Sequence, residues 1–181
     1  MAHSDDQLRA LARARYETGR WRRTAGPALL ALCVTALALA LGAPVALTLS
    51  LGAGVCVVAI LAVHRGQGWD RGVVPGVLAG GLVGAAALLV ERVDACCAGQ
   101  DSAACVTACI VGGGIAGGFL VWRVLRAPSE RRRRMLLSGG ILAATTASMG
   151  CAVGGAVGLG GMLVALAALT APALLWRPTR A

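Results

Sequence analysis

The chain has 181 residues, of which 57% are hydrophobic and only 3% aromatic, and its net charge is +9. A mean hydropathy of +0.76 excludes an ordinary soluble domain, because long stretches without charge favour lipid over water as the solvent. The positive charge does not indicate nucleic-acid binding, since the arginines lie at the ends of apolar stretches and no recognition helix or stacking surface accompanies them.

Residues 1–24 are expected to form a cytoplasmic amphipathic segment. Leu8, Leu11 and Tyr16 recur at helical spacing and form one apolar stripe, with arginines around the remainder. Two interpretations remain open. The segment is either a helix that lies on the inner membrane surface or a short helix whose stripe binds a cytoplasmic protein.

Residues 25–176 are expected to form an all-α transmembrane domain of six helices, arranged as three helical hairpins. Three apolar stretches, each bracketed by arginine, are long enough to cross a bilayer twice, since about 40 residues of helix extend roughly 60 Å. The chain is expected to reverse at 42–44, at the polar stretch 91–102 and between 154 and 161. Residues 177–181 would form a cytoplasmic tail.

The distribution of arginine predicts the orientation of these helices. All seventeen basic residues are arginine, and in this threading only Arg92 lies on the external side. The four tryptophans, Trp21, Trp69, Trp122 and Trp176, all fall at the opposite ends of the helices, as interfacial anchors do. Both termini are therefore expected in the cytoplasm. The use of arginine without any lysine, together with the absence of asparagine, suggests a GC-rich genome, so we expect a bacterial protein of the inner membrane.

Glycines at four-residue spacing predict close helix packing of the glycine-zipper type. They lie in the third, fourth and fifth predicted helices: Gly76, Gly80, Gly84, Gly113, Gly117, Gly150 and Gly154. Whether these seams form within one chain or between two copies is open, so a homo-oligomer is one interpretation. The match of 112–117 to the dinucleotide fingerprint is discounted, because that motif requires a preceding strand in a soluble unit.

Five of the seven cysteines gather at the predicted external end of the helices: Cys96, Cys97, Cys105, Cys109 and Cys151. Structural disulfides, unpaired thiols and a thiol-redox or soft-metal site are the three interpretations. The candidate metal ligands are Cys96, Cys97, Cys105 and Cys109. The other two, Cys33 and Cys56, are expected to be small core residues.

No catalytic residue and no cofactor is predicted. The proposed spans contain no Asp, Glu, His or Lys, whereas ion-coupled transporters carry ionisable groups within the membrane. The two histidines, His3 and His64, fall on the side opposite the cysteine cluster, so no Cys/His dyad is expected. We therefore expect neither an enzyme nor an ion-coupled transporter.

The segment 4–23, the three predicted hairpins and the five external cysteines together resemble small six-span bacterial inner-membrane anti-sigma proteins. The resemblance covers overall architecture and no diagnostic motif. It implies a regulator that holds a cytoplasmic partner, such as an alternative sigma factor, and responds to external thiol state. Two alternatives remain: a soft-metal uptake protein that uses the external cysteines for a mercury-like ion, and a structural subunit of a membrane complex.

Overall fold

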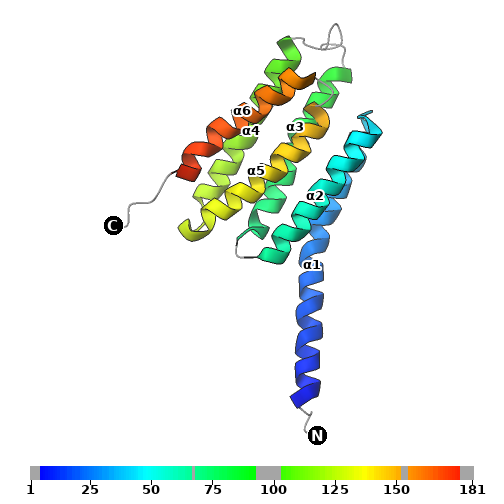
Figure 1. Ribbon diagram of the computed structural model, residues 1–181, viewed down its shortest axis with the longest axis vertical. Coiled ribbons are helices and arrows are strands. Elements are labelled where there is room, and N and C mark those ends of the chain that lie inside the picture. Colours follow the sequence, from blue (N-terminus) through cyan, green and yellow to red (C-terminus); the bar gives the residue numbers. More distant parts are fainter. Residues whose placement is uncertain (1–4, 67, 93–102, 152–154, 176–181) are drawn as a thin grey trace, which may run out of the picture.

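The computed structural model describes residues 5–66, 68–92, 103–151 and 155–175, and within these ranges every regular element is a helix. The prediction of an all-α chain with six helices is confirmed (Figure 1). The helices are α1 (Asp5–Ala40), α2 (Val45–Arg65), α3 (Asp70–Arg92), α4 (Ala103–Leu125), α5 (Ser129–Cys151) and α6 (Gly155–Leu175).

Four helical segments are long and apolar enough to cross a membrane: Val45–Arg65, Asp70–Val90, Val106–Leu125 and Gly155–Leu175. At most half of each segment is buried within the protein, and large side chains such as Leu82, Ile115 and Val164 point outward with about 70% of their surface exposed. So much outward-facing apolar surface is compatible with a membrane protein. The apolar part of α1, Thr24–Ala40, is shorter.

The least apolar stretch of the bundle lies at its centre. Helix α5 contacts all five other helices, and eleven of its residues are buried. Its buried hydroxyls bond to backbone carbonyls: Thr146 donates to Leu142 at 2.7 Å, and Ser138 donates to Trp69 at 2.9 Å. The second bond ties α5 to the start of α3. A helix that contacts five others needs less apolar outer surface, which explains why α5 carries small and hydroxyl side chains.

Helices α3 and α5 run parallel with their backbones in contact. A β-carbon at Gly76 would lie 2.5 Å from the carbonyl oxygen of Gly139. A β-carbon at Gly80 would overlap the backbone of Ala143, and one at Gly150 would overlap that of Gly84. Residue numbers rise together along the two helices, so the pair is parallel. Glycine is required at these positions because any side chain would separate the two backbones.

Helices α4 and α6 form a second parallel pair. A β-carbon at Gly113 would lie 2.5 Å from the carbonyl oxygen of Met162, and one at Gly117 would lie 3.1 Å from the β-carbon of Leu169. The fourth helix was expected to pack its glycines within the group of α3, α4 and α5. The structure instead places Gly113 and Gly117 against α6.

The expected arrangement as three hairpins is not confirmed. Helices α1 and α2 do form a hairpin, with Gly42 in the reversal at a φ of 88°. The closest partner of α3 is α5, however, and that of α4 is α6. The expected reversal between 154 and 161 is wrong for most of that range, because α6 is already helical from Gly155. Gly154, expected in a packing seam, lies outside the described residues. Backbone contact at small residues, rather than adjacency in the chain, decides these pairings.

We expect Gly80→Leu to destabilise the bundle by more than about 2 kcal/mol, because the added side chain would enter the backbone of α5. Gly118→Leu is the matched control, since a β-carbon there meets nothing within 4 Å. Both changes gain up to about 1 kcal/mol in helix propensity, so the control should keep or raise the melting temperature. Thermal unfolding in mild detergent, followed by circular dichroism, measures both. Equal melting temperatures would contradict the close contact.

Candidate functional site

Two buried thiols from different helices meet at one end of the bundle. Cys109 lies in the second turn of α4, and Cys151 is the last residue of α5. Their sulfur atoms are 3.1 Å apart, with the Cys109 thiol donating to the sulfur of Cys151. The two residues are 2% and 0% exposed, respectively. The fold thus brings together two cysteines that are 42 positions apart in the chain.

A glycine of α6 makes room for this thiol pair. A β-carbon at Gly158 would lie 3.4 Å from the sulfur of Cys109, an ordinary van der Waals distance, so α6 packs directly against the thiol. Both cysteines belong to an apolar cluster that includes Val83, Ala147 and Met162. The pair is therefore shielded on the α6 side, and only small solutes are expected to reach it.

The chemistry open to this pair is disulfide formation. A disulfide bond is about 2.05 Å long, so the two sulfur atoms need to approach by about 1 Å. Because the thiols lie on different helices, the bond would tie the end of α5 to α4. This pairing is more specific than the sequence alone indicates, since helical spacing associates Cys109 with Cys105 rather than with Cys151.

The other predicted cysteine positions are less informative. Cys96 and Cys97 lie outside the described residues, and Cys105 lies in the first turn of α4. Cys56 is half-buried, whereas Cys33 is exposed on α1, so the expectation that Cys33 is a core residue is wrong. Within 5–66, 68–92, 103–151 and 155–175, no group of three or more His, Cys, Asp or Glu residues could hold a metal ion.

The predicted amino-terminal segment is continuous with the first apolar helix. Helix α1 runs unbroken from Asp5 to Ala40 and includes Leu8, Leu11 and Tyr16. Figure 1 shows the amino-terminal half of α1 projecting beyond the other helices. A single helix therefore joins the candidate partner-binding stripe to the interior of the bundle.

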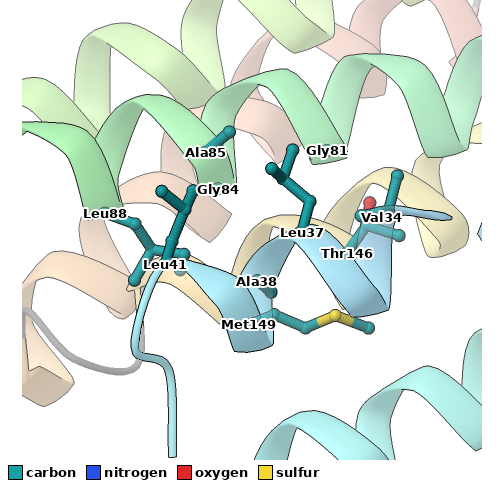
Figure 2. Close-up of a pocket in the computed structure, with 11 residues that line it drawn as sticks. Val34, Leu37, Ala38, Leu41, Gly81, Gly84, Ala85, Leu88, Thr146 and Met149 are labelled. Carbon is teal, nitrogen blue, oxygen red and sulfur yellow. The ribbon is translucent and has the colours of Figure 1, made fainter.

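The other half of α1 lies against α3 and α5, close to the end of α5 that carries the thiol pair. Figure 2 shows Leu37 of α1, and Leu41 just past the end of α1, beside Gly84 and Leu88 of α3, with Met149 of α5 alongside. The cavity left among these side chains is only about 10 Å³, which is room for a single water molecule at most. Because the packing is this close, motion of the end of α5 would displace the side chains of α1 that contact it.

Met149 and Cys151 lie on opposite faces of α5, because two residues correspond to about 200° of helix rotation. Met149 belongs to the apolar cluster formed with α1 and α2, whereas Cys151 belongs to the cluster formed with α4 and α6. The last turn of α5 thus contacts the thiol partner on one face and the α1 side of the bundle on the other.

Comparison with known proteins finds no matching family model, no similar curated protein and no similar solved structure. The function has to be inferred from the chain's own geometry. Two features carry that inference: the buried thiol pair on α4 and α5, and the continuous helix α1, which packs on the side of α5 that carries Met149.

Proposed function

We propose that the chain is a six-span protein of the bacterial inner membrane with both termini in the cytoplasm. The distribution of arginine supports this orientation, and so do interfacial contacts at the ends of α2 and α4. The guanidinium of Arg126 lies 4.0 Å from the centre of the Trp122 ring, and that of Arg65 lies 6.0 Å from the Trp69 ring. Helix α5 crosses through its apolar part, 135–151, which at about 1.5 Å per residue extends roughly 25 Å.

Topology reporters test this orientation. A reporter inserted between 93 and 102 is expected to be active only outside the cytoplasm. The same reporter inserted between 126 and 129, in the α4–α5 connection, is expected to be active only inside. Alkaline phosphatase and a fluorescent protein that fails to mature outside the cytoplasm give opposite readouts for each site. Cytoplasmic activity at the first site would overturn the orientation.

We further propose that the protein is a regulator whose input is the redox state of the Cys109–Cys151 pair. The single observation that carries this proposal is the 3.1 Å approach of two buried thiols on different helices. Hydrogen peroxide is the proposed oxidant, because it is small enough to reach a shielded site. One thiol is converted by the peroxide to a sulfenic acid, releasing one water. The second thiol displaces the hydroxyl group to form the disulfide, releasing another water.

The proposed output is a change in how tightly α1 binds a cytoplasmic protein, with an alternative sigma factor as the leading candidate. Disulfide formation draws Cys151 toward α4, and Met149 on the opposite face of α5 then moves away from the α1 side. Because α1 is one helix, a shift in its packing on α3 and α5 also moves its projecting half, which carries Leu8 and Leu11. This movement would alter binding of the partner. The thiol site and the partner site would thus communicate through α5 and α1.

The first test is oxidation of the purified full chain in detergent. Peroxide is expected to produce a disulfide-linked peptide containing Cys109 and Cys151, identified by mass spectrometry after proteolysis. Cys151→Ser should abolish this species, whereas Cys33→Ser, which removes an exposed cysteine of α1, should leave it unchanged. Failure to form the Cys109–Cys151 link in the folded protein would remove the proposed input.

The second test is capture of the partner by the full chain in its native membrane. Leu8→Asp combined with Leu11→Asp is expected to reduce capture at least tenfold, because charges on the apolar stripe would be desolvated on binding. Ala10→Asp combined with Arg13→Gln makes the same change in net charge on the opposite face of the helix and serves as the control. Peroxide should release the partner from the parent chain but not from Cys151→Ser. Equal capture by both double variants would contradict binding through this stripe.

A further inference from the structure

An open apolar groove separates α5 from α6 on the outside of the bundle. Its volume is about 360 Å³, and its lining includes Gly140 and Ala144 of α5 and Ala167 of α6. These small residues create the hollow, since a β-carbon at Gly140 would meet nothing within 4 Å. Thr170 also lines the groove, but its hydroxyl donates to the carbonyl of Leu166 at 2.9 Å. The groove therefore suits a hydrocarbon chain.

An arginine stands at the end of this groove nearest the start of α5. Arg133 precedes the lining residues Leu137, Gly140 and Ala144 by four, seven and eleven positions, a spacing that places all four on one face of the helix. Its side chain is exposed. The groove thus has an apolar body and a cationic end.

Two neighbouring arginines have other contacts. Arg132 donates to the carbonyl oxygens of Ala127 and Leu125 at 2.8 and 2.9 Å, and so closes the end of α4. The aliphatic part of Arg131 packs against Gly68, since a β-carbon on that glycine would lie 3.0 Å from the β-carbon of Arg131. Arg134 lies about 100° further round the helix than Arg133, away from the centre of the groove face. The position of Arg133 on the helix therefore assigns it to the groove.

The electrostatics of the start of α5 favour an anion there. Four consecutive arginines occupy the first two turns of α5, where the helix dipole is already positive, and Glu130 offsets only part of that charge. An anionic group beside Arg133 would lower this unfavourable energy and pair with the guanidinium.

We propose that the α5–α6 groove binds a phospholipid with an anionic headgroup, with one acyl chain along the groove and the phosphate at Arg133. This inference rests on the proposed orientation, in which the start of α5 lies at the inner membrane surface. A second copy of the chain fits the groove less well. Copies in one membrane share an orientation, so their arginine runs would meet at the same depth and repel each other.

Lipid retention by the purified full chain tests the proposal. Protein reconstituted with equal amounts of phosphatidylglycerol and phosphatidylcholine of identical acyl chains is extracted in mild detergent, and native mass spectrometry measures the bound lipid. The parent chain is expected to retain phosphatidylglycerol preferentially. Arg133→Gln should lower that preference about fivefold, and Arg133→Lys should restore most of it. Arg71→Gln, an exposed arginine at the same end of the bundle, is the charge-matched control and should change little.

Ala144→Phe fills the groove and should reduce retention of both lipids while leaving Arg133 in place. Equal retention of the two lipids by the parent chain, an equal loss in Arg71→Gln, or a dimer in place of bound lipid would each overturn the proposal. Lipid retention does not depend on thiol oxidation. Loss of selective retention with an intact peroxide response would therefore count against the lipid site alone, and the reverse result would count against the proposed regulator alone.

Discussion

Backbone contact between α3 and α5 is the constraint on which the rest of the structure depends. Glycines at 76, 80, 84, 139 and 150 allow the two helices to approach more closely than side chains would permit. Apolar helices in an apolar solvent gain little from burial, so such contacts decide which helices pair. Because α3 pairs with α5, α4 pairs with α6. Helix α5 also contacts α4 and α6, and so joins the two parallel pairs.

The central position of α5 gives it two roles in the proposed mechanism. At one end its last turn carries Cys151 toward α4 and Met149 toward the side of the bundle where α1 lies. At the other end Arg132 bonds to the last carbonyl of α4, Arg131 packs on Gly68, and Arg133 is the proposed site of a lipid phosphate. Helix α5 therefore connects the thiol site, the surface on which α1 packs and the arginine-rich end of the bundle.

Sequence reasoning predicted the helices well because charge and hydropathy vary over the length of a whole helix. It correctly located the six helices and the reversal at Gly42, and four segments meet the length and hydropathy of a membrane span. It predicted close packing among the third, fourth and fifth helices but not that α3 pairs with α5 and α4 with α6, since glycines at four-residue spacing indicate a contact without specifying the partner helix. It grouped Cys109 and Cys151 among five external cysteines but could not pair them, because only tertiary packing brings their sulfur atoms together.

The parallel pairing of α3 with α5 has a consequence for how the protein is made. A ribosome releases α3 before α4, and α4 before α5, so the glycine face of α3 stays without its partner while about 40 further residues are synthesised. During that interval, small residues of other nascent helices are competing partners for the same face. Correct assembly thus depends on α5, which is synthesised late. A chain truncated before Ser129 would leave the glycine face of α3 open to association with other helices.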